Sequence, residues 1–126
     1  MYYQSTEQSP LQRDIYSINV FGKKKKLLSE KRGSNNADFS KNYKYFINTY
    51  SSANTPNTIT LCNAKGKIIR IIKNSEQLIE KLKEYDLTKK EFFDFTTEQG
   101  VNLNGWMMKP VDFDENKKHP VLMYVY

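Results

Sequence analysis

Residues that could do catalytic or metal chemistry are scarce in this chain of 126 residues. Cys62 is the single cysteine and His119 the single histidine, so no disulfide can close within the chain and no zinc site can be built mainly from thiolates and imidazoles. Acyl transfer by serine would need a nucleophile, a base and an orienting acid, often with the nucleophile on a strained G-x-S-x-G turn. That pattern occurs nowhere in the sequence. The residues alone therefore predict no complete catalytic site, no metal and no cofactor.

The charge pattern indicates solvated surface rather than a nucleic-acid site. Twenty Lys and Arg against 14 Asp and Glu give a net charge of +6. The positive residues gather near predicted turns, at Lys23–Lys26, Lys31–Arg32, Lys89–Lys90 and Lys117–Lys118. Neither a basic helix nor an arginine-rich run occurs, so we predict no nucleic-acid partner. The longest apolar runs are five or six residues, far below the ~20 that a membrane-spanning helix needs, so no membrane span is predicted.

The elements that could position functional groups begin with an internal repeat. The segments IYSINVFGK and ITLCNAKGK start at positions 15 and 59, an offset of 44 residues (59 minus 15). This offset aligns Asn19 with Asn63 and Gly22 with Gly66. Each copy predicts a β-hairpin whose turn glycine supplies a positive φ.

The second copy belongs to a predicted unit of four short antiparallel strands joined by turns. The strands are Ala37–Ser40, Tyr43–Ser51, Ile59–Cys62 and Lys67–Lys73. Four strands on a period of about 40–50 residues are typical of a β-propeller blade. The first 29 residues would supply the last three strands of a preceding blade, making about one and a half blades. A small free-standing antiparallel sheet, with hairpins similar by chance, is the alternative.

A different pattern follows residue 73. Asn74 can cap a helix, with Gln77 three residues on completing a capping box. The apolar residues at helical spacing are Leu78, Ile79 and Leu82. The helix should end near Tyr85, and we interpret residues 74–90 as a connector between two domains.

Two strands, a polar loop and an apolar segment complete the chain. Residues 90–97 and 101–109 predict a β-hairpin with Gly100 at its turn. A polar loop at 112–118 leads into Pro120–Val125, a nearly continuous apolar run. Such a run is typical of a strand buried on both faces, as in the central sheet of an α/β domain.

Read in order, these segments resemble bacterial dipeptidyl peptidase IV proteins, of the prolyl oligopeptidase clan of serine peptidases. The resemblance covers essentially all 126 residues, through YYQSTEQSPLQRDIYSIN, NNADFSKNYKYFINTYSSANTP and NGWMMKPVDFDENKKHPVLMYVY. It implies a mainly β fragment: the terminal one and a half blades of a β-propeller at 1–73, a connector with a helix at 74–90, and the first strands of a truncated α/β-hydrolase catalytic domain at 91–126.

The resemblance also implies a function for the parent protein, a serine exopeptidase that releases X-Pro and X-Ala dipeptides from peptide N-termini. In that family the tyrosine closing the corresponding strand lends its hydroxyl to the oxyanion hole, and the matching position is Tyr126. The family's Ser, Asp and His triad would follow downstream, so His119 is not its catalytic base. The family's substrate-binding glutamates and arginine match no residue here. We therefore expect this piece alone to be inactive.

The same likeness implies partners and a location. These are peptide substrates, a homodimer of the parent protein, and the periplasm or another exported location. A non-enzymatic β-propeller interaction module is the alternative function. The positive charge alone suggests a third, a nucleic-acid binder, which would show strongly salt-dependent binding.

Overall fold

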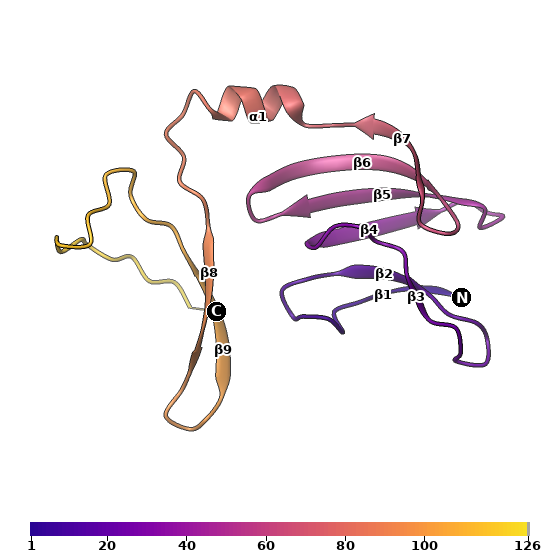
Figure 1. Cartoon of the computed structure of the whole chain (residues 1–126), viewed down its shortest axis with the longest axis horizontal. Coiled ribbons are helices and arrows are strands. Elements are labelled where there is room, and N and C mark those ends of the chain that lie inside the picture. The colour runs from indigo at the N-terminus through magenta and orange to yellow at the C-terminus, as the bar shows by residue number, and fades with distance from the viewer. Residues whose placement is uncertain (126) are drawn as a thin grey trace. The chain divides into compact units, whose positions relative to one another are not determined.

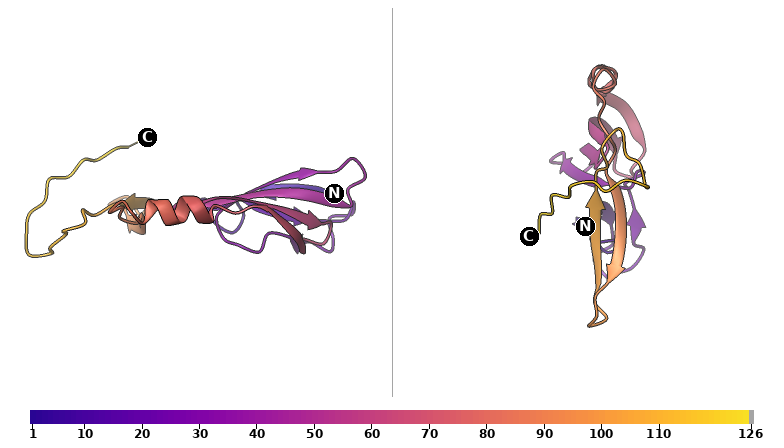
Figure 2. Two further views of the ribbon diagram at one scale, coloured as in Figure 1. Left: turned by 90° about the horizontal axis from the view of Figure 1, so that it is seen from above. Right: turned by 90° about the vertical axis from the view of Figure 1, so that its left-hand side faces the viewer.

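The chain is mainly β, as predicted. A computed structural model describes residues 1–125, and within that range it has nine strands and one helix (Figures 1 and 2). The elements are β1 (Tyr2–Ser5), β2 (Asp14–Ser17), β3 (Lys26–Leu27), β4 (Ser34–Phe39), β5 (Tyr45–Ser52), β6 (Thr55–Asn63), β7 (Ile68–Lys73), α1 (Glu76–Leu82), β8 (Glu91–Thr96) and β9 (Asn102–Met107). They fall into two compact units, Met1–Lys81 and Leu82–Tyr126.

The first unit opens with an antiparallel sheet of three strands in the order β1-β2-β3. Ile15 and Tyr16 in β2 are buried, as suits β-branched and aromatic side chains on a pleated surface. Tyr3 of β1 lies opposite Tyr16, and the two rings stack with their centroids 5.4 Å apart. The prediction of three strands within the first 29 residues is confirmed.

The second sheet of this unit has four strands in the order β4-β5-β6-β7, each antiparallel to the next. Along β5 the buried Phe46 and Asn48 alternate with the exposed Tyr45 and Ile47, which is the period of a strand covered on one face. Register shifts occur within β5 and β6, and such irregularities strengthen the strand twist seen in Figure 2. The predicted four-strand unit is confirmed, with β4 starting earlier than expected, at Ser34.

The two sheets bury a shared core. Ile15 of β2 and Leu28, which directly follows β3, pack with Phe46 of β5 and Cys62 of β6. The ring of Phe39 borders this core, with its centroid 4.9 Å from that of Phe46. Burying an apolar side chain of this size contributes about 1.5–3 kcal/mol. Apolar contact between the sheets therefore holds the first unit together.

The 44-residue repeat appears in the structure as two hairpin turns with the same side-chain hydrogen bonds. In the first, the Asn19 side-chain oxygen accepts hydrogen bonds from the backbone N–H groups two and four residues on, at 3.1 and 2.7 Å. In the second, the Asn63 oxygen accepts the same two bonds at 2.9 and 3.1 Å. The glycine three residues after each asparagine has a positive φ, +72° at Gly22 and +88° at Gly66. Both predicted turns are confirmed.

The second unit contains the predicted hairpin of β8 and β9, with Gly100 at its turn and a φ of +80°. Phe93 lies opposite Gly105, and its ring is so close that a Cβ at position 105 would lie 2.4 Å from it. The glycine thus lets the aromatic ring lie across the neighbouring strand. An ion pair between Lys109 and Glu91, with its N–O distance at 2.9 Å, joins the open end of the hairpin.

The helix is shorter than predicted. It begins at Glu76 and has seven residues, whereas we expected a cap at Asn74 and an end near Tyr85. Ser75 directly precedes the first helical residue, and its hydroxyl donates to the carbonyl of Asn57 at 2.5 Å. No residue of α1 is buried. Because short helices depend on packing of an apolar face, nothing in this helix supports further turns.

The strand predicted at Pro120–Val125 is not formed in this structure. Residues 121–125 run without regular structure, and their side chains are 79–99% exposed. A strand buried on both faces needs paired neighbouring strands and covering layers, and none of the three sheets within residues 1–125 includes this segment. The polar loop before this segment is present, as turns between residues 111 and 117.

Candidate functional site

Tyr126, the predicted oxyanion residue, lies outside the described residues. The ordered segment that leads toward it is the stretch from Phe113 to His119, here called the 113–119 loop. It connects the hairpin of β8 and β9 to the exposed segment 121–125. The contacts within this loop fix the part of the chain that leads to position 126.

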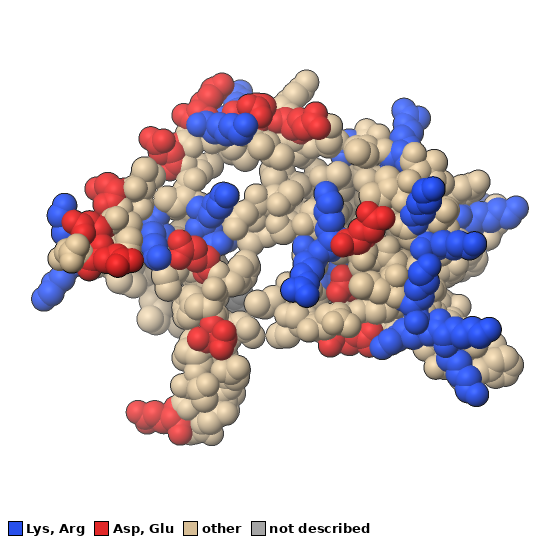
Figure 3. All heavy atoms as spheres, viewed as in Figure 1, with Lys and Arg blue, Asp and Glu red and all other residues tan. Residues whose placement is uncertain are grey.

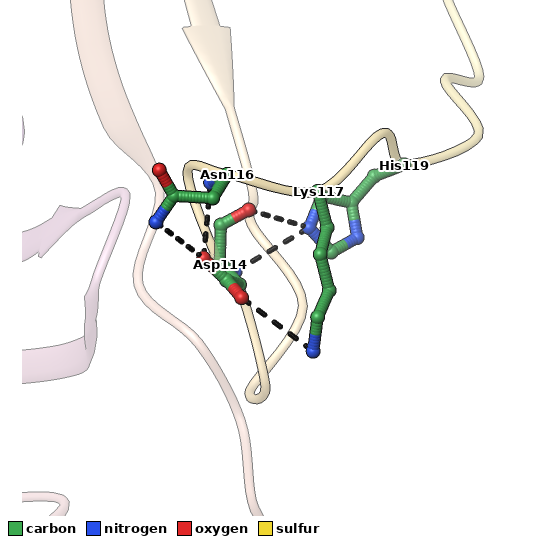
Figure 4. A network of polar contacts seen from close by, with 4 residues as sticks. All are labelled: Asp114, Asn116, Lys117 and His119. Atoms are coloured by element: carbon green, nitrogen blue, oxygen red, sulfur yellow. Dashed lines mark hydrogen bonds and ion pairs between the residues drawn. The ribbon is translucent and has the colours of Figure 1, made fainter.

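The carboxylate of Asp114 organises this loop (Figure 4). Its Oδ1 accepts hydrogen bonds from the backbone N–H and the side-chain amide of Asn116, at 3.0 and 3.1 Å. Its Oδ2 lies 3.5 Å from the ammonium of Lys117. The two bonds from Asn116 lower the pKa of Asp114, because both stabilise the charged carboxylate. Asp114 is therefore an ionised structural anchor, not a proton donor.

His119 closes the 113–119 loop, and it lies outside the strands and the helix, as predicted. Its Nε2 lies 3.3 Å from the backbone nitrogen of Asp114 and 3.1 Å from the carbonyl oxygen of the same residue (Figure 4). In one tautomer this nitrogen accepts from the N–H, and in the other it donates to the carbonyl. The imidazole also stacks on Phe113, with the centroids 5.0 Å apart. Its described contacts thus all serve the loop.

Cys62 is not suited to act as a nucleophile. Its side chain lies in the core between the two sheets of the first unit, with Sγ 3.6 Å from the hydroxyl of Thr60. Burial raises the pKa of the thiol, because the thiolate would lose its hydration. The thiolate is the reactive form, so this cysteine serves packing.

A buried polar network joins the two sheets, and the sequence analysis missed it. The Asn48 amide donates to the Asn35 side-chain oxygen at 3.0 Å. The Asn35 amide in turn donates to the backbone carbonyls of Arg13 and Lys31, at 3.1 and 3.0 Å. Arg13 precedes β2 and Asn35 lies in β4, so these bonds tie one sheet to the other. The only sequence signal was that both asparagines fall on the inward positions of their strands.

The described residues offer no assembled metal site. Among residues 1–125, no group of three His, Cys, Asp or Glu side chains lies close enough to hold a metal ion. In the same range, no helix has the length and apolar character needed to cross a bilayer. The 113–119 loop holds the start of the segment that leads to position 126.

Comparison with known proteins finds one matching family model and several similar proteins. The family model described as "Dipeptidyl peptidase IV (DPP IV) N-terminal region" matches residues 1–57. A probable dipeptidyl peptidase 4 from Trichophyton verrucosum is 32% identical over 129 aligned residues, and dipeptidyl peptidase 4 from Arthroderma otae is 33% identical over the same length. Each alignment covers 100% of this chain and 17% of the relative.

A solved structure agrees along nearly the whole chain. The crystal structure of Porphyromonas gingivalis dipeptidyl peptidase 4 superposes with a TM-score of 0.88 and 43% sequence identity, covering 94% of this chain and 17% of that one. The chain thus spans about one sixth of the length of the proteins it matches. The resemblance stated from the sequence is confirmed: this chain matches a fragment of dipeptidyl peptidase IV family proteins.

Proposed function

We propose that this chain forms the junction between a β-propeller and an α/β-hydrolase domain in a serine-type dipeptidyl peptidase. Residues 1–73 supply propeller strands, 74–90 the connector and 91–126 the first strands of the catalytic domain. The observation that carries this proposal is the likeness to dipeptidyl peptidase 4 proteins along 94–100% of the chain. The names of the relatives refer to full-length proteins. The activity proposed here is therefore that of the whole protein, of which this chain is one part.

The geometry of the first unit supports the propeller part. Each blade of a propeller is a four-stranded antiparallel sheet in sequence order that packs face to face on the next. The sheet β4-β5-β6-β7 has this order, and β1-β2-β3 has the order of a blade's last three strands. The two sheets share a core, and their equivalent turns recur 44 residues apart.

Exposed apolar residues of the second unit support the proposed hydrolase domain. The apolar segment 121–125 has the composition of a central strand, but it forms no strand in this structure and its residues are exposed. The side chains of Phe92, Phe95 and Trp106 in the preceding hairpin are also exposed. In the whole protein, neighbouring strands and helices of the catalytic domain would cover these surfaces.

Tyr126 has the chemistry that acyl transfer needs at the end of that strand. A phenol can donate a hydrogen bond to the oxyanion that develops when serine attacks the carbonyl of a peptide bond. The nucleophile, base and acid of the triad belong to parts of the protein outside these 126 residues, since no G-x-S-x-G turn occurs here. The substrates would be peptides with Pro or Ala as the second residue, and the isolated chain would be inactive.

A Gly-Pro reporter substrate tests this proposal. In the whole protein, Tyr126→Phe should lower kcat by about 100- to 1000-fold with little change in KM, because the hydroxyl acts on the transition state. Tyr124→Phe, which removes a hydroxyl two residues away, is the matched control and should retain activity within about threefold. The 126-residue chain alone should not cleave the reporter.

Two results would contradict the proposal. If Tyr126→Phe kept the wild-type kcat, Tyr126 would not be the oxyanion donor. If the isolated chain cleaved the reporter, the triad would not lie in other parts of the protein. A whole protein that binds peptides or proteins but hydrolyses no reporter would instead support the propeller interaction module.

A further inference from the structure

Three turns of the first unit form a strongly basic surface at one end of its two sheets. With the strand residues at their edges, these turns are residues 18–26 between β2 and β3, residues 40–45 between β4 and β5, and residues 63–67 between β6 and β7. We call this surface the basic end. Its lysines number eight (four, two and two), with no Asp or Glu in the three turns: Lys23, Lys24, Lys25, Lys26, Lys41, Lys44, Lys65 and Lys67. All eight are exposed.

Direct contacts bring the three turns together. The backbone N–H of Ala64 donates to the carbonyl of Lys44 at 2.9 Å, which joins the second and third turns. Tyr43 of the second turn stacks on Tyr2, with the ring centroids 6.0 Å apart, and Tyr2 pairs with Ser17 where the first turn begins. Figure 3, in the same view as Figure 1, shows Lys and Arg atoms crowded along this right-hand edge.

This charge segregation is not needed to fold the turns. Of the eight lysines, Lys25 alone forms an ion pair within residues 1–125, with Glu7 at 3.0 Å. The connections from β1 to β2 and from β3 to β4 carry both signs, with Glu7 and Arg13 in the first and Glu30 and Lys31 in the second. Like charges so close together repel, and a negative partner would relieve this repulsion.

An apolar tip stands among these lysines. Val20 and Phe21 are 82% and 81% exposed, and the side chain of Asn19 holds their turn by accepting from the N–H of Phe21 at 3.1 Å. The equivalent turn at 63–67 makes the same hydrogen bonds with Ala64 and Lys65 at the corresponding positions. Folding of the turn therefore does not require an apolar tip, and the exposure of Phe21 needs another explanation.

We propose that the basic end docks on the surface of an anionic lipid bilayer. The lysines contact the headgroups, and Val20 and Phe21 enter the interface between headgroups and acyl chains, as in other peripheral anchors that combine basic and apolar residues. A bilayer fits better than a nucleic acid, because the three turns contain no arginine for bidentate contacts and present apolar side chains instead. This inference does not depend on the proposed peptidase activity.

Vesicle cosedimentation of the 126-residue chain tests the proposal. It should bind phosphatidylcholine vesicles containing about 30% phosphatidylserine and should not bind phosphatidylcholine alone, with affinity falling as salt rises. Because one lysine near an anionic surface contributes about fivefold, Lys23→Gln, Lys24→Gln and Lys26→Gln together should weaken binding about a hundredfold. Phe21→Ser should weaken it by about tenfold at unchanged net charge.

A control variant changes three exposed lysines outside the basic end, Lys73→Gln, Lys89→Gln and Lys118→Gln, with the same loss of charge. It should bind nearly as well as the unmodified chain, and near-UV circular dichroism checks that every variant keeps its fold. Equal losses in the two triple variants, unchanged binding of Phe21→Ser, or no binding to anionic vesicles would each overturn the proposal. So would tighter binding to a DNA duplex of about 20 base pairs, which would make the surface a nucleic-acid site.

Discussion

Two turn glycines show how one residue can link secondary structure to packing. Gly22 and Gly66 occupy equivalent positions of the repeated turn, and both have a positive φ. A Cβ at position 22 would meet no atom within 4 Å, whereas one at position 66 would lie 2.5 Å from the carbonyl oxygen of Leu28. The second turn is thus packed against the backbone of the first sheet, so Gly66 serves the contact between sheets as well as its own turn.

Substitution of these glycines by alanine separates the two effects. Gly22→Ala should lower the free energy of unfolding by about 1–2 kcal/mol, the cost of a Cβ in the left-handed region. Gly66→Ala should cost about 1–3 kcal/mol more, because the added methyl overlaps the backbone of Leu28. Urea unfolding followed by circular dichroism measures both values. Equal losses would contradict the packing role of Gly66.

At the scale of elements, the short-range features could be predicted and the long-range ones could not. The hairpin turns at Gly66 and Gly100 depend on residues a few positions apart, so glycine and strand alternation were sufficient to find them. The bond between Asn35 and Asn48 depends on pairing of β4 with β5 and on the neighbouring sheet, which local patterns do not contain. The strand expected at 120–125 is not formed in this structure for a similar reason, because a strand needs neighbouring strands that a local pattern does not contain.

The 113–119 loop gives a prediction about pH. The pKa of Asp114 is lowered from its ordinary value of 3.8, so ionisation of this residue favours the ordered loop. The contribution is fully present above the unfolded pKa and is lost as pH falls through the lower folded pKa. The amide proton of Asn116, which donates to this carboxylate, should therefore shift in NMR spectra with a midpoint below pH 3.8.

Asp114→Asn is the matched variant, since it keeps the shape of the side chain and removes the charge. It should abolish the titration of the Asn116 amide while leaving the hairpin of β8 and β9 intact. A midpoint at or above pH 3.8 in the unmodified chain would show that the carboxylate is not held by these hydrogen bonds.

At the scale of the whole molecule, one chain combines a well-packed region with exposed apolar surfaces. The first unit has a shared core of residues from two sheets, including Ile15, Leu28 and Phe46. The second unit leaves both faces of its hairpin and the segment 121–125 largely exposed. In the proposed peptidase these surfaces lie inside the catalytic domain, and the role of Tyr126 depends on the strand that forms there.

Hydrogen exchange of residues 121–125 tests that central claim most directly. In the isolated chain these backbone amides should exchange at nearly the rate of an unstructured peptide, because the segment belongs to no helix or strand. In the whole protein they should be protected by at least about a thousandfold, since they would pair on both edges within the hydrolase sheet. Rapid exchange in both forms would contradict the account, because the segment would then not be a strand and Tyr126 would have no fixed place beside the scissile carbonyl.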